Sequence, residues 1–522
     1  MREQLALLPG YLAAHLQLSL VALLVGVGVS IPLGIFASGR PRLEAPLLGV
    51  ASAIQTIPSL ALLAIAVPLL SAAGLILARF GIPLRGIGFV PALLALSLYS
   101  MLPILRSTVV GLRGVDPAVL EAARAVGMTR RQRLWRVELP LALPVIVAGL
   151  RTSAVWVVGT ATLSTPVGAT SLGNFIFGGL ATRNDAAVLL GCVASAGLAL
   201  LLDGLIRMLE RGVRERERPR IALAAAVLAL LYLWTGASFA WERRAAEPEV
   251  TIGSKPFTEQ YVLAEILALR VAAAGATPRL LPSLGSTVAF DALRGDDLDL
   301  YVDYSGTLWA TVLQHKDLPA RRENVLAEVR RVLAERYGIE VVCALGFENT
   351  YALAMRADEA RAKGIARISD LAAAAPGLTI GGDYEFLQRA EWRALRDRYG
   401  LRFREERSMD PALMLRALVS GQVDVISAYS TDGRIAAEHL VLLDDDKGVI
   451  PPYDAILLAS PRLARTRPEL LARLRRLAGA IDADTMRRMN LAVDRDGKSP
   501  AAVAREFTGS SSTSDPFSPT RR

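Results

Sequence analysis

The sequence is poor in the residues that most often carry enzyme chemistry. Its 522 residues include only three histidines and two cysteines. The histidines, His15, His315 and His439, are too far apart to show the spacing of a metal site, and no Ser/His/Asp or Cys/His grouping indicates a nucleophile. Cys192 lies in an apolar run and Cys343 in a more polar region, so no disulfide framework is expected. We therefore expect no metal, no cofactor and no catalytic activity.

The sequence patterns of ATP binding and of nucleic-acid binding are incomplete or missing. Gly497, Lys498 and Ser499 match the end of a phosphate-binding loop, but Ala492 stands where that loop needs its first glycine. ATP hydrolysis coupled to this chain must then occur on a separate subunit. Basic residues do not alternate with aromatic ones in a stripe, so the net charge of +9 predicts no nucleic-acid partner.

Hydrophobic residues make up 52% of the chain, and they are distributed unevenly. The first ~240 residues contain apolar stretches long enough to cross a bilayer. These stretches lie near residues 17–38, 47–70, 88–112, 142–164, 187–207 and 221–241. We expect about six transmembrane helices surrounded by membrane lipid, and we expect the N-terminal segment to be retained, because no cleavage site follows a short apolar core.

Arginines predict the orientation of these spans. One set of connections carries Arg40, Arg42 and the arginines within 113–136 and 207–220. The other set carries only Arg79, Arg85 and Arg183, with Arg2 at the N-terminus. Because positive residues accumulate on the cytoplasmic side, the first set should be cytoplasmic, and everything after residue 241 should be external.

The most basic connection is the segment from Asp116 to Pro140. Asp116 can cap a helix over Pro117–Val126, Gly127 can end or bend it, and a second short helix can follow over Met128–Trp135. Two short helices joined by a glycine form a compact projection that suits a groove on a partner.

This segment resembles the EAA loop of ABC importer permeases. The matching residues are Glu121, Ala122, Ala123, Gly127, Leu139 and Pro140. Val137 stands where isoleucine is usual. The resemblance implies that the loop docks onto a cytoplasmic ABC ATPase subunit, and that two copies of the membrane half form a homodimer in a bacterial inner membrane. Residues 55–64 and 168–173 also resemble the permeases of betaine and choline importers.

From Val250 onward, short strand-like runs alternate with amphipathic helices, which indicates an α/β fold. The strands are expected at 250–252, 298–302, 339–342, 378–380, 423–426 and 455–458. The clearest helices are expected at Thr258–Ala273, Phe386–Tyr399 and Pro411–Val419. We divide the chain into a permease domain (1–220), a last transmembrane helix and linker (221–247), a substrate-binding domain (248–507) and a disordered tail (508–522).

The second half resembles type II periplasmic substrate-binding proteins for quaternary ammonium osmoprotectants. The motifs that carry this resemblance lie at 253–260, 303–307, 349–351, 382–386 and 428–432. The resemblance implies two lobes that close on a ligand, joined by two crossing segments near 347–351 and 428–452.

The ligand chemistry predicts which residues would line the site. A trimethylammonium group has no N–H to donate, but aromatic faces attract its charge and cover its methyl groups. Tyr304, Tyr351, Tyr429 and Tyr453 fall in or beside the motifs, so we expect them to form an aromatic cage, and Tyr384 could also face the cleft. The alternative is that these rings simply pack in the core.

The polar end of a betaine would need hydrogen-bond donors. Gln260, Thr258 and Thr307 are candidates because they stand beside expected helix N-termini. Lys255 could add charge or be an ordinary surface lysine, and Asn349 could touch the ligand or orient Tyr351.

We therefore expect a fused permease and substrate-binding subunit of an ATP-driven importer for betaine- or choline-like solutes, with the binding domain on the periplasmic or extracellular side. The alternatives are an importer of another quaternary ammonium compound such as ergothioneine, an amino-acid importer, and a membrane receptor that does not transport.

Overall fold

The computed structural model describes residues 2–78, 80, 86–182, 184–244, 249–314 and 322–510. The chain forms two compact units, Met1–Phe177 with Asp185–Glu247, and Gly178–Asn184 with Pro248–Arg522. Several residues named above lie outside the described ranges, namely His315, the three arginines expected to be external (Arg79, Arg85 and Arg183) and residues 511–522 of the expected tail.

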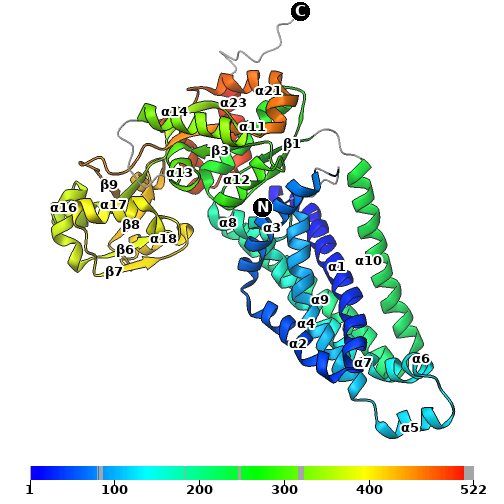
Figure 1. Cartoon of the computed structure of the whole chain (residues 1–522). Coiled ribbons are helices and arrows are strands. Elements are labelled where there is room, and N and C mark those ends of the chain that lie inside the picture. The colour runs from blue at the N-terminus through cyan, green and yellow to red at the C-terminus, as the bar shows by residue number, and fades with distance from the viewer. Residues whose placement is uncertain are drawn as a thin grey trace, which may run out of the picture. The chain divides into compact units, whose positions relative to one another are not determined.

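The first unit is helical (Figure 1). Its long helices are α1 (Arg2–Ser38), α4 (Phe89–Arg113), α7 (Leu139–Ala161), α9 (Asp185–Glu215) and α10 (Arg218–Arg244). In the described part of the chain, five helices are long and apolar enough to cross a membrane, or up to six if one bent pair counts as a span. This agrees with the expectation of about six.

Helices α4 and α7 pack closely because a glycine lies between them. A Cβ atom added to Gly149 of α7 would lie 2.4 Å from Cβ of Ser107 in α4. Nearby, the Ser153 hydroxyl of α7 donates to the Ser100 carbonyl of α4 at 2.8 Å. Small residues that allow such contact are a common way to pack helices in lipid.

The predicted span at 47–70 is not a straight helix. It consists of α2 (Pro41–Thr56) and α3 (Ser59–Ala78), which meet at an angle of 98°. Pro58 explains the break, because a proline disfavours helical geometry at the residue before it. Ile57 is accordingly extended, with φ −69° and ψ 126°.

The projecting segment begins as predicted and ends differently. The Asp116 carboxylate accepts from the Ala118 amide at 2.8 Å and caps α5 (Pro117–Ala125), and Gly127 follows with φ +77°. The second helix is not short. It begins as α6 (Arg130–Arg133), continues through a π-helical turn at Leu134–Glu138, and runs on into α7. Further along, a 3-10 turn (Thr162–Val167) and α8 (Gly173–Ala181) follow α7.

The second unit contains two five-stranded mixed sheets. The first has the order β2-β1-β3-β10-β4, and its strands are β1 (Glu249–Gly253), β2 (Thr277–Leu281), β3 (Leu300–Tyr304), β4 (Glu340–Glu348) and β10 (Asp454–Ala459). The second has the order β7-β6-β8-β5-β9, and its strands are β5 (Tyr351–Arg356), β6 (Thr379–Gly382), β7 (Glu405–Ser408), β8 (Val425–Tyr429) and β9 (Leu440–Leu443).

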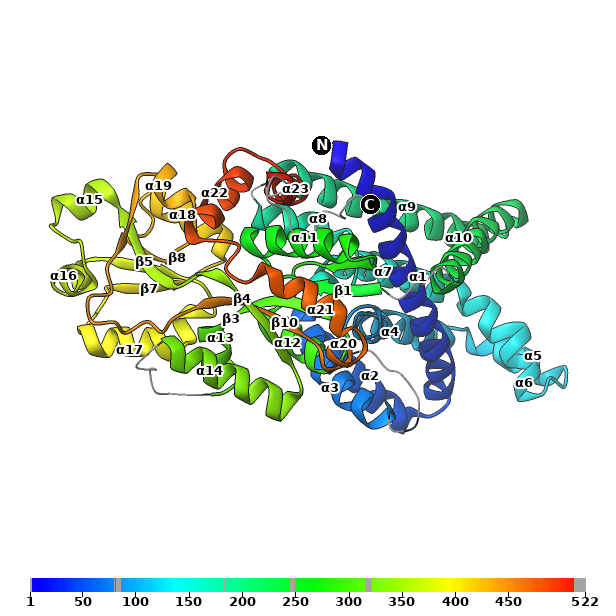
Figure 2. The ribbon, with the colours of Figure 1, turned by 90° about the horizontal axis from the view of Figure 1, so that it is seen from above.

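The chain crosses between the sheets twice. The first crossing lies between β4 and β5, and the second lies between β9 and β10. Both fall where they were predicted, at 347–351 and within 428–452. Each sheet with its helices is therefore one lobe, as seen from above in Figure 2.

Helices cover both sheets. In the first lobe they are α11 (Thr258–Ala273), α12 (Ser286–Arg294), α13 (Ser305–Thr311), α14 (Arg322–Val332), α20 (Pro461–Thr466), α21 (Pro468–Leu474), α22 (Ala483–Asp494) and α23 (Pro500–Ser510). In the second lobe they are α15 (Ala357–Ala362), α16 (Ile368–Ala374), α17 (Ala390–Tyr399), α18 (Pro411–Val419) and α19 (Arg434–Ala437). Helix α23 extends past Thr508, where we expected the disordered tail to begin.

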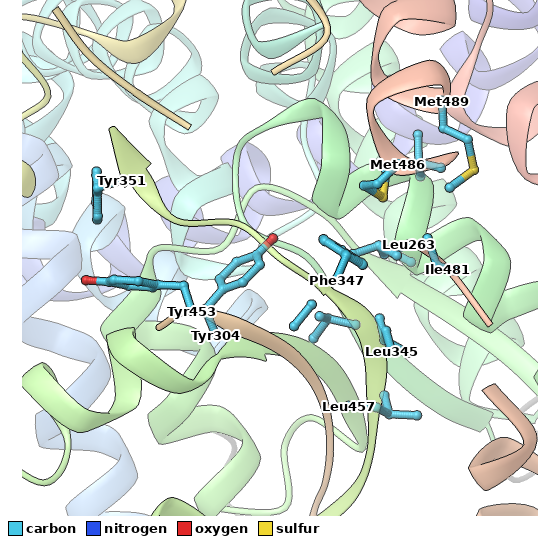
Figure 3. Packing of buried hydrophobic residues seen from close by; sticks show 14 of the residues in the cluster. Leu263, Tyr304, Leu345, Phe347, Tyr351, Tyr453, Leu457, Ile481, Met486 and Met489 are labelled. Atoms are coloured by element: carbon cyan, nitrogen blue, oxygen red, sulfur yellow. The ribbon is translucent and has the colours of Figure 1, made fainter. Parts of the chain in front are cut away.

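The predicted helix at Phe386–Tyr399 is divided. A 3-10 turn occupies Phe386–Gln388, and Arg389 is extended before α17 starts. A buried hydrophobic cluster draws residues from both sheets and their helices, including Ile252, Leu457 and Trp392. The cluster also contains Tyr304, Tyr351 and Tyr453 (Figure 3).

Candidate functional site

The four cage candidates lie at the ends of strands. Tyr304 ends β3, Tyr429 ends β8, Tyr351 starts β5, and Tyr453 directly precedes β10. In the antiparallel pairing of β5 with β8, Tyr351 stands opposite Tyr429. In the pairing of β10 with β3, Ala455 stands opposite Tyr304, which brings Tyr453 to the same edge.

The rings form one contiguous cluster. The centroid of the Tyr351 ring lies 5.0 Å from that of Tyr429 and 5.6 Å from that of Tyr453, where the contact is edge to face. The ring of Phe257 stacks 5.8 Å from Tyr429 and 6.2 Å from Tyr304, so it joins the fourth tyrosine to the others. Phe257 was not among the predicted site residues, although it lies inside the first motif.

Two cations of the protein lie over these rings. The Arg389 guanidinium carbon is 5.3 Å from the Tyr351 centroid, and the Lys255 ammonium is 5.7 Å from the Tyr304 centroid. Lys255 is buried in an ion pair with Asp303, with Nζ 2.5 Å from the carboxylate. The alternative, that Lys255 is an ordinary surface lysine, is therefore wrong.

Behind Tyr304 lies a buried carboxylate that was not predicted. Glu259, in the first turn of α11, is 2% exposed. One of its oxygens accepts from the Tyr304 hydroxyl at 2.5 Å and from the Asn349 amide at 2.9 Å. Its other oxygen accepts from the Thr431 hydroxyl at 2.5 Å and from the Asn490 amide at 3.3 Å. Glu259 thus ties β3 and α22 of the first lobe to the first crossing and to the loop after β8.

A second carboxylate holds Tyr453. The Tyr453 hydroxyl donates to Glu391 of α17 at 2.6 Å, and Glu391 is also 2% exposed. Arg389 lies 3.3 Å from both groups and also pairs with Glu385. These contacts join α17 of the second lobe to the segment that leads into β10.

Burial controls the protonation of this cluster. It raises the pKa of Tyr304, Tyr429 and Tyr453, and the neighbouring carboxylates of Glu259 and Glu391 raise those of Tyr304 and Tyr453 further. The rings are therefore neutral phenols. Burial also raises the pKa of Glu259, against the opposing effect of its four hydrogen bonds.

The predicted donors have different surroundings. The Gln260 amide donates to the Val302 carbonyl at 3.1 Å and to the Tyr304 hydroxyl at 3.0 Å, so it holds Tyr304 in place. The Thr258 hydroxyl donates to Asp494 at 2.5 Å. Thr307 is buried in α13 beside the cluster.

The last two predicted site residues, Asn349 and Tyr384, differ in burial. Asn349 is buried, bonded to Glu259, and its backbone N–H donates to the Tyr453 carbonyl at 3.0 Å. Tyr384 is 59% exposed, and its position gives no support to a place in the cage.

The projecting segment forms a separate candidate surface in the first unit. Glu121, Ala122 and Gly127 are exposed, whereas Ala123 is 6% exposed. Leu139 packs partly buried beside Leu112, Ala142 and Ile146, and Pro140 is exposed in the first turn of α7. Exposed apolar residues flank the glycine turn, with Val126 72% and Trp135 63% exposed.

Comparisons with known proteins cover both units. Residues 248–510 match the substrate binding domain of ABC-type glycine betaine transport systems, and residues 30–215 match the inner membrane component of binding-protein-dependent transport systems. The ergothioneine transport permease/ergothioneine binding protein of Helicobacter pylori is 31% identical over 500 residues, which is 91% of this chain and 85% of that protein.

Other relatives match one unit each. The choline transport system permease protein of Bacillus subtilis is 41% identical over 197 residues, 38% of this chain and 84% of that protein. The carnitine transport binding protein of Listeria monocytogenes is 31% identical over 268 residues, 50% of this chain and 87% of that protein.

Proposed function

This chain belongs to the ABC importers of the glycine betaine and choline class, with the permease and the substrate-binding domain fused in one polypeptide, and we propose that it captures and takes up a quaternary ammonium solute. It is a membrane-integral transporter subunit and not an enzyme. Permeases of this family associate with an ABC ATPase and act on a small-molecule ligand.

The observation that carries the substrate class is the cluster of Tyr304, Tyr351, Tyr429 and Tyr453 with Phe257. These residues come from both lobes and from both crossings, so closure of the lobes would assemble a surface of aromatic faces around a cation. Ring centroids 5.0 Å apart leave no space for a trimethylammonium group between Tyr351 and Tyr429. The rings must separate, or offer their outer faces, when the ligand enters.

Ergothioneine is the second candidate ligand. It also carries a trimethylammonium group, and the Helicobacter pylori relative has the same fused arrangement over 91% of this chain. An amino acid with a primary ammonium would instead need an acceptor for its N–H groups. In the present structure, the hydrogen-bond capacity of Glu259 is used by four protein donors.

The remaining parts of the assembly follow from the membrane unit. We propose that the surface around Glu121 and Gly127 docks onto a separate ATPase subunit, that two membrane domains form a homodimer surrounded by lipid, and that residues 248–507 lie outside the cytoplasm. The arginine distribution supports this orientation. Fusion would keep the binding domain at a high effective concentration beside the pore.

Titration of the full chain in lipid nanodiscs tests this proposal. We expect glycine betaine, choline, carnitine or ergothioneine to bind far more tightly than a primary-amine analogue such as ethanolamine or glycine. Tighter binding of the primary amines would contradict the proposed ligand class. Binding without ATP-dependent uptake in reconstituted vesicles that contain the ATPase would favour a receptor.

A further inference from the structure

Two tyrosines of the cluster donate their hydroxyl groups to buried carboxylates. Tyr304 donates to Glu259 at 2.5 Å, and Tyr453 donates to Glu391 at 2.6 Å. Both carboxylates are 2% exposed and lie behind the rings. A phenol that donates to a carboxylate shifts electron density onto its ring, which strengthens the attraction of that ring for a cation.

The two carboxylates differ in their surroundings. Glu391 lies 3.3 Å from Arg389, so part of the charge of Glu391 is offset by this cation, which also pairs with Glu385. The four hydrogen-bond donors that the described residues supply to Glu259 are two hydroxyls and two side-chain amides, all of them neutral. In a buried environment, a carboxylate held by neutral donors exerts a field that water screens only weakly.

We propose that Glu259 is a specificity-determining residue of the binding domain, whose negative charge, acting directly and through the Tyr304 hydroxyl, makes the cage select a cation over a neutral solute of the same shape. This inference rests on the proposed function, because it assigns the origin of charge selectivity within that aromatic site. The rings would fit the shape of the trimethylammonium group, and the buried anion would favour its positive charge.

A purely structural role for Glu259 is the competing explanation. Its bonds to Tyr304, Asn349 and Thr431 position side chains of the first lobe, of the first crossing and of the loop after β8. If positioning were its only role, removing its charge would weaken every ligand of the same shape to a similar extent. The two roles therefore predict different effects on the ratio between the affinity for a cationic ligand and the affinity for a neutral ligand of the same shape.

Choline and 3,3-dimethylbutan-1-ol provide the required pair of probes. The alcohol has the shape of choline, with a neutral carbon in place of the charged nitrogen. Both are titrated against the full chain in nanodiscs, as wild type and as Glu259→Gln. Gln keeps the shape, and the buried side-chain oxygens of Asn349 and Asn490, which have no hydrogen-bond partner among the described residues, can accept its new N–H group after rotation of either amide.

We expect Glu259→Gln to weaken choline binding roughly tenfold, while the affinity for the neutral alcohol changes by a much smaller factor. Tyr304→Phe, which removes only the hydroxyl link, should reduce the same preference by a smaller amount. Glu405→Gln is the matched control, since it removes one negative charge from an exposed position on β7 and should leave the ratio unchanged. Thermal unfolding of each variant checks that it is folded.

The outcomes separate the two proposals. If the wild type prefers choline and Glu259→Gln keeps that full preference, the role of Glu259 is refuted while the quaternary ammonium site stands. An equal loss for both probes also refutes it, in favour of positioning alone. If the wild type binds the neutral alcohol as tightly as choline, both proposals fail. If it binds neither probe, the inference about Glu259 fails, and the titration with carnitine and ergothioneine decides the proposed function.

Discussion

Replacement of Tyr351 gives the most direct test of the cage, because this ring lies at its centre. It contacts Tyr429, Tyr453 and Phe386, with centroid distances of 5.0, 5.6 and 5.0 Å. Within the part of the chain that the structure describes, its hydroxyl accepts one long hydrogen bond, from the Tyr429 hydroxyl at 3.4 Å. The ring should therefore matter far more than the hydroxyl.

The magnitudes follow from these contacts. A desolvated cation–π contact is worth up to about 2 kcal/mol, so Tyr351→Ala should weaken choline binding by roughly thirtyfold. Tyr351→Phe keeps the face and loses only a weak bond, worth about 0.5 kcal/mol, so the change should be about twofold. The loss of affinity for Tyr304→Phe should lie between these two values, because the Tyr304 hydroxyl donates a hydrogen bond to buried Glu259.

The assay is calorimetric titration of the full chain in nanodiscs with choline, and with ethanolamine as its primary-amine analogue. Because Tyr351 is 4% exposed, Tyr351→Ala should also cost about 3–5 kcal/mol of folding free energy, so thermal unfolding is measured in parallel. Equal losses for the Ala and Phe variants at 351, or tighter binding of ethanolamine, would refute the cage and favour an amino-acid importer.

Three further predictions concern coupling, topology and pH. Glu121→Lys or Gly127→Trp, the latter at φ +77°, should abolish uptake and leave ligand binding unchanged; normal uptake would contradict the docking surface. A tag after Arg522 should be cut by protease added to intact spheroplasts, whereas a tag within 207–220 should be protected, and the reverse pattern would refute the orientation. Burial raises the pKa of Glu259 above its ordinary 4.5, so between pH 4.5 and the raised pKa the folded chain keeps a proton that the unfolded chain has lost, and above the raised pKa Glu259 carries its negative charge. The stability of the wild type relative to Glu259→Gln should then fall as pH rises from about 4.5 through the raised pKa. No fall in that window, with a rise as pH approaches about 4.5 from below, would show that the pKa is instead lowered.

Local sequence patterns determined much of the fold. Helices at Thr258–Ala273 and Pro411–Val419 have the predicted ends, and the first crossing lies between Glu348 and Tyr351 as expected. Periodicity and helix signals are local, so they are readable without knowing the partners of a segment. The strands β2, β5, β7 and β9 were not predicted. For β7 the reason is clear: it is short, charged and exposed, so only its pairing with β6 defines it as a strand.

The sequence also indicated which tyrosines lie together, because all four fall in or beside the motifs that resemble a known family. It did not determine what stands behind them. Glu259 meets partners up to 231 residues away, and Lys255 meets Asp303 across 48 residues. The exposure of Tyr384 was not predicted from the sequence either. Burial, charge compensation and hydrogen-bond saturation depend on which distant groups the packed lobes bring together, so only the tertiary structure decided them.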